Sequence, residues 1–96
     1  MYYNYITRGD LKQLTNEEIQ KLIKENDAVC FLIGEEELKS EITKKTEIAY
    51  IYKEALEGGK YILLIKDITE KEKITRTLVN YFNIRKTKPK RILIIE

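Results

Sequence analysis

The sequence predicts one small α/β domain, with a mainly parallel sheet covered by helices on both faces. Two runs, AVCFLI at 28–33 and YILLI at 61–65, are apolar at every position, as strands are when helices cover both faces of their sheet. Segments with helical spacing separate the strand-like runs, which gives the order β-α-β-α-β-α-β. A chain of 96 residues suits a single domain, so we assign residues 1–96 to one unit.

The first half of the chain begins with a strand. YYNYIT at 2–7 is rich in aromatic and β-branched residues, and RGDLKQ at 8–13 is expected to be a loop. A helix then starts with a capping box, in which Thr15 is the N-cap and Glu18 stands three residues later. The strand at 28–33 follows this helix.

A long helix is predicted between the two apolar strands. In EEELKSEITKKTEIAYIYKEALE, the side chains at helical spacing form an apolar stripe: Leu38, Ile42, Ala49, Tyr52 and Leu56. The segment 35–40 can instead be loop, with the helix starting near Ser40 or Glu41. Gly58 and Gly59 then supply a left-handed C-cap.

The second half continues with the strand at 61–65 and a third helix. Asp67 or Thr69 is expected to cap this helix and Asn83 to end it, and one apolar face collects Ile74, Leu78, Tyr81 and Phe82. The basic loop RKTKPKR at 85–91 and a short strand at 92–95 complete the chain.

These elements predict an open three-layer sandwich with a four-stranded, mainly parallel sheet. Helical crossovers favour parallel strands, and right-handed crossovers place helices on both faces. The arrangement resembles Rossmann-like folds, and we expect the flavodoxin-like order 2-1-3-4 for the four predicted strands. The strands at 28–33 and 61–65 should be central or nearly so.

The amino-acid composition excludes several classes of catalytic and metal site. The chain has no histidine, which excludes a Ser-His-Asp triad, a Cys-His pair and the usual zinc sites. Its single cysteine, Cys30, lies in an apolar run and is expected to be buried in a reducing compartment. A net charge of +2 does not by itself indicate nucleic acid. No apolar run approaches the roughly 20 residues that span a bilayer, so we expect a cytoplasmic protein without membrane contact. The abundance of Lys, Glu and Ile fits a thermophile, or an AT-rich genome.

Candidate ligand-binding residues follow the predicted strands, because open parallel sheets bind ligands at their carboxyl ends. Tyr5, Thr7 and Arg8 lie at the end of the first strand, and Gly34 follows the second. There is no G-x-G-x-x-G and no Walker A motif, so no particular cofactor is indicated. The acidic run GEEE at 34–37 is interpreted as solvated, and no metal site is predicted.

Two segments resemble TIR-like domains and nucleoside 2-deoxyribosyltransferases over about residues 22–67. LIKENDAVCFLIG resembles the strand entry of these families, and KKTEIAYIYKEALEGGKYILLIKD resembles their helix and following strand. The resemblance implies that Glu47 is the catalytic carboxylate at the N-glycosidic bond of NAD or a nucleoside. Such a carboxylate stabilises or attacks the positive charge that develops on the ribose. The resemblance also places Tyr5, Thr7 and Arg8 in the pocket for the base or the phosphate.

Three hypotheses therefore remain open, in order of preference. The first is a dimeric binding or regulatory module that takes a nucleotide-like ligand at the strand ends. The second is an N-glycosidic bond hydrolase or transferase that uses Glu47. The third is a nucleic-acid-associated protein that uses the cationic side chains of the 85–91 loop: Arg85, Lys86, Lys88, Lys90 and Arg91. A homodimer is expected through a sheet edge, or through a helix face formed by Tyr50, Ile51 and Tyr52.

Overall fold

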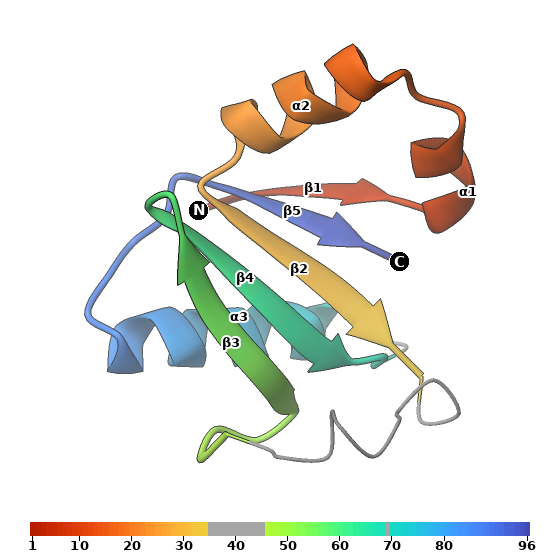
Figure 1. Cartoon of the computed structure of the whole chain (residues 1–96). Helices are drawn as coiled ribbons and strands as arrows, with labels where there is room; N and C mark the ends of the chain where they lie inside the picture. Colours follow the sequence, from red (N-terminus) through yellow and green to blue (C-terminus); the bar gives the residue numbers. More distant parts are fainter. Residues whose placement is uncertain (35–45, 69) are drawn as a thin grey trace.

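The computed structural model describes residues 1–34, 46–68 and 70–96, and in these residues the chain forms a five-stranded, mostly parallel sheet with three helices (Figure 1). The elements are, in chain order, β1 (Tyr2–Ile6), α1 (Arg8–Lys12), α2 (Asn16–Glu25), β2 (Ala28–Ile33), β3 (Ile51–Glu57), β4 (Lys60–Lys66), α3 (Lys71–Ile84) and β5 (Arg91–Ile95). The strand order is β1-β5-β2-β4-β3. Strands β1, β5, β2 and β4 are parallel, and β3 pairs antiparallel with β4 at one edge. The predicted α/β class is confirmed.

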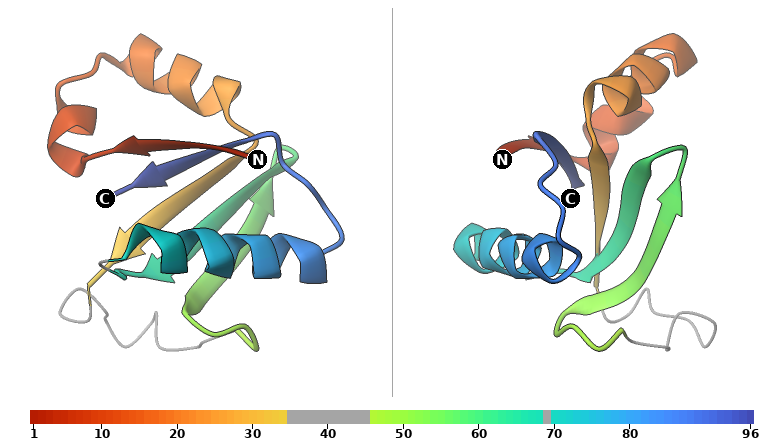
Figure 2. Two further views of the ribbon diagram at one scale, coloured as in Figure 1. Left: turned by 180° about the vertical axis from the view of Figure 1, so that it is seen from behind. Right: turned by 90° about the vertical axis from the view of Figure 1, so that its left-hand side faces the viewer.

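The helices form layers on both faces of the sheet (Figure 2). The connection from β1 to β2 carries α1 and α2 over one face, and the connection from β4 to β5 carries α3 over the other. The connection from β1 to β2 passes over β5, and the connection from β4 to β5 passes over β2. The two connections therefore cross the sheet in opposite directions. Right-handed crossovers that run in opposite directions put their helices on opposite faces, which explains the layers.

The face under α3 holds most of the core. Most residues of β2, β4 and β5 that point to this face are buried, among them Cys30, Leu63 and Ile94, and Tyr61 is partly buried. The opposite face has a smaller cluster in which Val29, Leu93 and Ile95 are buried. Helix α2 has no fully buried residue, so the face that it covers is the less tightly sealed of the two.

Local sequence signals explain where α2 and α3 lie. The predicted capping box is confirmed: Thr15 Oγ1 accepts from the Glu18 N–H at 3.2 Å, and Glu18 accepts from the Thr15 N–H at 3.0 Å. The predicted apolar face of α3 is also confirmed, since its four side chains are at most 1% exposed: Ile74, Leu78, Tyr81 and Phe82. The predicted cap of α3 is wrong, because the N-cap is Glu70, which makes no side-chain capping bond.

The long predicted helix is wrong over residues 51–57, which form strand β3. Residues 35–45 of that prediction lie outside the described residues. The Gly58-Gly59 pair has φ of +56° and +77° and forms the two-residue turn of the β3–β4 hairpin. Both a helix C-cap and this turn require positive φ, so the glycines fit either structure, and pairing with the apolar β4 decides in favour of the strand. The helix face predicted for dimerisation is also wrong, because Ile51 and Tyr52 lie in β3 and are buried.

The predicted strand order 2-1-3-4 is wrong too. The four predicted strands lie in the order 1-4-2-3, and the last strand of the chain is inside the sheet between β1 and β2. Asp27 fixes this position, because its Oδ2 accepts from the backbone N–H groups of Lys90 at 2.9 Å and Arg91 at 3.1 Å. The carboxylate thus anchors the start of β5 beside the start of β2. Strand β5 is thus paired with a neighbouring strand on each side.

The expected loop at 8–13 contains the short helix α1. Thr7 is its N-cap, and the Thr7 hydroxyl accepts from the Asp10 N–H at 3.0 Å. The chain therefore turns from β1 directly into a helical turn, which brings Arg8 to the end of the sheet. Among the described residues, no helix is long and apolar enough to cross a membrane.

Candidate functional site

The carboxyl ends of the four parallel strands share one edge of the sheet. Thr7 follows β1, Glu96 follows β5, Gly34 follows β2 and Asp67 follows β4. From this edge, α1 leads away over one face and α3 over the other, and the ends of β5 and β2 lie between them. Open α/β sheets bind ligands at the carboxyl ends of their strands.

A cavity of about 320 Å³ opens at this edge, beside the first turn of α3. Its lining combines apolar side chains with two carboxylates and one ammonium group: Leu32, Asp67, Ile68, Lys71, Ile74 and Glu96. The Lys71 ammonium lies 4.0 Å from a Glu96 carboxylate oxygen and 4.4 Å from the centroid of the Tyr5 ring. The volume is at the lower end of the range for small-molecule sites, which are typically apolar with a few polar groups.

The structure brings the predicted residues Tyr5 and Arg8 close to this cavity. Tyr5 contacts its lining through Lys71. The Arg8 guanidinium donates to the Leu32 carbonyl at 2.7 Å, and the Arg8 backbone N–H donates to the Glu96 carbonyl at 2.9 Å. Arg8 thus joins the ends of β1, β2 and β5, and it places a cation next to two residues that line the cavity.

The other two predicted residues, Thr7 and Gly34, lie at the same edge. Thr7 uses its hydroxyl to cap α1, and Gly34 directly follows β2. Lys71 and Glu96 were not predicted. Glu96 was missed because the last strand was expected outside the centre of the sheet, and Lys71 because the sequence does not show which residue of α3 faces the strand ends.

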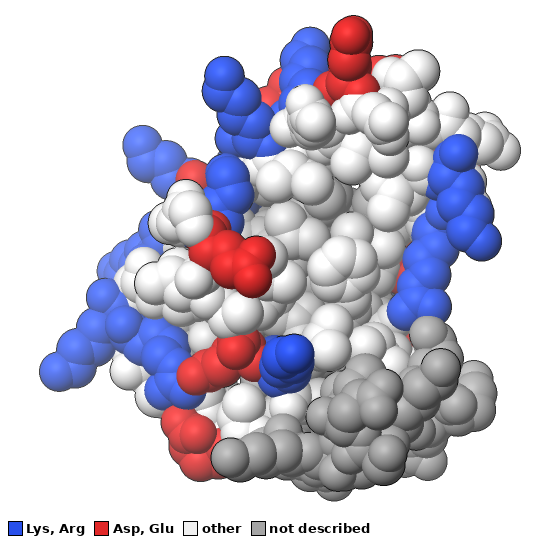
Figure 3. Space-filling model, viewed as in Figure 1, with Lys and Arg blue, Asp and Glu red and all other residues white. Residues whose placement is uncertain are grey.

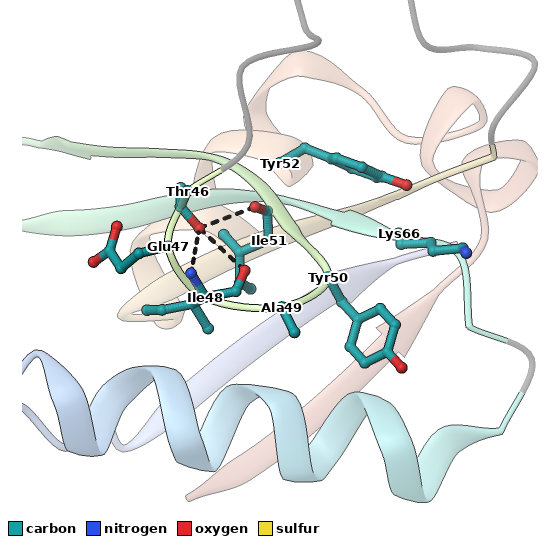
Figure 4. A pocket seen from close by; sticks show the side chains of 8 residues that line it. All are labelled: Thr46, Glu47, Ile48, Ala49, Tyr50, Ile51, Tyr52 and Lys66. Atoms are coloured by element: carbon teal, nitrogen blue, oxygen red, sulfur yellow. Dashed lines mark hydrogen bonds between the residues drawn. The ribbon is translucent and has the colours of Figure 1, made fainter.

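Glu47 lies in a tight turn and not in a helix (Figure 4). The Thr46 hydroxyl holds this turn, since it accepts from the Ile48 N–H at 3.2 Å and donates to the Ile51 carbonyl at 3.0 Å. Tyr50 adopts φ of +70°, which reverses the chain into β3. The Glu47 side chain is 69% exposed at the rim of a second cavity, of about 400 Å³, which is lined by residues 46–52 and Lys66.

The Glu47 carboxylate pairs with Arg85, the C-cap of α3. Its Oε1 lies 3.0 Å from Arg85 Nη2, and the same guanidinium binds both carboxylate oxygens of Glu54, at 2.6 and 2.8 Å. The backbone N–H of Glu47 itself and then the Arg85 side chain lower the pKa of the Glu47 carboxyl. Glu47 is therefore held ionised as part of a Glu47–Arg85–Glu54 cluster.

This cluster and the cavity at the carboxyl edge lie at opposite ends of α3. Lys71 is the first residue of the helix and Arg85 follows its last, and 14 residues at 1.5 Å each give a helix of about 20 Å. None of Tyr5, Thr7 and Arg8 lines the cavity at Glu47. The catalytic role of Glu47 stays a prediction, and the residues implied for the nucleotide pocket do not gather around it.

Beyond Arg85, the basic loop runs to the amino edge of the sheet, where β5 begins. Arg85 is engaged by Glu54 and Glu47. Lys86, Lys88, Lys90 and Arg91 are exposed, whereas Pro89 is buried. Arg85 is thus paired with two carboxylates, whereas the other four predicted phosphate-binding residues are exposed.

The remaining candidate groups are Cys30 and the acidic run after β2. Cys30 is fully buried, as predicted, and burial raises the pKa of its thiol. Within the described parts of the chain, no three metal-ligating side chains converge. The acidic run after Gly34 lies outside those parts.

Comparison with protein-family models, curated proteins and solved structures gives no match.

Proposed function

We propose that this protein is a small α/β binding or regulatory module that takes a nucleotide-like ligand at the carboxyl edge of its sheet. The observation that carries the proposal is the cavity between the ends of β5, β2 and β4 and the first turn of α3. Its position agrees with the general rule for open α/β sheets.

The chemistry of the lining suits the parts of a nucleotide. Lys71 and the neighbouring Arg8 supply positive charge for a phosphate, and α3 presents the N–H groups of its first turn without a side-chain cap. Asp67 and Glu96 provide carboxylate acceptors for ribose hydroxyls. Leu32, Ile68 and Ile74 offer apolar contact for a base.

Thermal denaturation in the presence of candidate ligands tests this proposal. AMP and ATP are expected to raise the Tm more than a nucleoside or inorganic phosphate does. A nucleoside or a phosphate alone fills only part of the site. Lys71→Gln should weaken nucleotide affinity about tenfold, by the loss of one charge-assisted contact. Lys73→Gln is the matched control, since Lys73 is an exposed lysine of the same helix that does not line the cavity.

Two results contradict the proposal. The first is a Tm that stays constant in millimolar AMP and ATP. The second is an equal loss of affinity in the Lys71 and Lys73 variants, which would place the ligand elsewhere on the surface.

The expected homodimer stays part of this proposal, with β1 as the contact edge. At the other edge, β3 carries Lys53, Glu54 and Glu57 and an irregular register after Ile51, features that block strand addition. Strand β1, YYNYI, has no charged residue. Tyr2 donates its N–H to Lys90 and Ile6 accepts from Glu96, so the alternate residues turn their backbone groups to the open edge. Light scattering after gel filtration should give twice the mass of 11.4 kDa, and a monomer at micromolar concentration would remove this part.

A further inference from the structure

The pairing of β1 with β5 brings an exposed aromatic ring to the basic loop. Tyr2 is the register partner of Arg91, its side chain is 61% exposed, and the Arg91 guanidinium lies 5.8 Å from its ring centroid. In the sequence, Tyr2 is far from the loop, and no aromatic residue is interleaved with its charges. We use the name amino-edge patch for the five exposed residues Tyr2, Lys86, Lys88, Lys90 and Arg91.

The backbone under the amino-edge patch is firmly held. Asp27 binds the N–H groups of Lys90 and Arg91, and the Tyr2 N–H donates to the Lys90 carbonyl at 2.7 Å. Pro89, directly before Lys90 in the chain, is buried. A fixed backbone lowers the entropy that is lost when the side chains bind a ligand, so the patch is better prepared for binding than a mobile basic loop.

Among the described residues, no carboxylate forms an ion pair with Lys86, Lys88, Lys90 or Arg91. The Asp27 carboxylate is directed to backbone N–H groups. Figure 3 shows lysine and arginine side chains along the side of the molecule on which the α3–β5 loop runs, with aspartate and glutamate side chains among them. Four cations therefore lie together at one edge of a chain whose net charge is only +2.

A hollow adjoins the amino-edge patch at the end of α3. This cavity of about 400 Å³ has a mixed lining, which includes Val79, Asn83, Thr87, Lys88 and Lys90. An aromatic ring, a row of cations and a partly apolar hollow with amide and hydroxyl groups are the features that bind bases and the phosphates between them.

We propose that the amino-edge patch binds single-stranded nucleic acid. Lys86, Lys88, Lys90 and Arg91 contact successive phosphates, and an unpaired base stacks on Tyr2. A single strand is favoured over a duplex because only an unpaired base exposes the face that Tyr2 can stack on. This site is at the opposite edge of the sheet from the nucleotide cavity and does not depend on it.

Fluorescence anisotropy with a labelled 12-nucleotide single strand tests the inference on the intact protein. Four phosphate contacts give a slope of log K against log salt of about −3, so affinity should fall roughly 50-fold between 50 and 200 mM salt. The double variant Lys88→Gln/Lys90→Gln should bring the slope to about −1.4. Its control is Lys12→Gln/Lys21→Gln, which removes the same charge from exposed residues of α1 and α2 and should leave the slope unchanged.

The stacking residue is tested separately. Tyr2→Ala should weaken binding about tenfold at constant salt slope, because the loss of a base–aromatic stack does not change the charge. Tyr50→Ala is the control, since Tyr50 is 48% exposed but belongs to the turn before β3. Three results overturn the inference: no binding at 50 mM salt, an equal effect of the two lysine pairs, or duplex binding as tight as single-strand binding with no effect of Tyr2→Ala.

Discussion

Asn26 is a buried polar residue that joins α2 to strand β1. It is 0% exposed, its Nδ2 donates to the Leu22 carbonyl at 2.8 Å, and its Oδ1 accepts from Asn4 Nδ2 at 3.3 Å. The Asn26 backbone N–H bonds to Ile23, so the Leu22 carbonyl receives the Asn26 side chain in place of a helical N–H. We predict that Asn26→Ala strongly lowers the stability of the whole domain.

The magnitude follows from these contacts. The substitution removes two hydrogen bonds worth about 1 kcal/mol each and leaves the Leu22 carbonyl without its partner. The free energy of unfolding should therefore fall by roughly 2–3 kcal/mol. For a domain of this size, the Tm should drop by roughly 10–20 °C.

Urea and thermal denaturation, followed by circular dichroism, measure this change. Asn80→Ala is the matched control, because Asn80 is exposed on α3 and its loss should cost less than about 0.5 kcal/mol. A double-mutant cycle with Asn4→Ala should give a coupling of about 0.5–1 kcal/mol. If Asn26→Ala were as mild as the Asn80 control, the junction described for α2, β1 and β2 would be wrong.

Four further predictions concern the cap of α2, the Cys30 thiol and, in two of them, the Glu47 carboxylate. Thr15→Ala should cost about 1 kcal/mol in chemical denaturation, since it removes the cap of α2, and an unchanged midpoint would contradict the capping box. Cys30 should resist thiol reagents in the native protein and react after unfolding, and rapid native labelling would show that it is not buried. Because the folded pKa of Glu47 is below its ordinary value of 4.5, its stabilising contribution is complete above that pH and is lost as pH falls through the lower folded pKa. Glu47→Gln should therefore flatten the loss of stability below about pH 4.5. The enzyme hypothesis makes a separate prediction for the same variant. The wild-type protein should release nicotinamide from NAD or base from a deoxynucleoside, and Glu47→Gln should abolish this release. Intact substrate after long incubation with the wild-type protein would exclude the enzyme hypothesis.

The sequence was sufficient for elements that are determined locally. The Thr15–Glu18 capping box and the apolar spacing of α3 contain their own signals, because a helix start and a helix face depend on residues close together in the chain. Strands β2 and β4 were likewise visible as uninterrupted apolar runs, but only Leu63 and Ile65 of β4 are buried, so β4 is not covered on both faces as predicted.

The parts that depend on contacts distant in sequence could not be predicted. Residues 51–57 fit helical spacing, and their pairing with β4 makes them a strand. The position of β5 inside the sheet depends on the contact between Asp27 and Arg91, 64 residues apart. For the same reason, the meeting of Lys71 with Tyr5 and Glu96, and of Tyr2 with Arg91, appears only in the folded chain.

Titration of the ¹⁵N-labelled protein with AMP, followed by backbone NMR, tests the proposed function most directly. The nucleotide should shift the amide signals of Leu32, Lys71 and Glu96, which line the cavity at the carboxyl edge, and leave those of the β3–β4 turn unchanged. Shifts confined to other parts of the chain, or no shift at millimolar AMP, would contradict a nucleotide site at this edge.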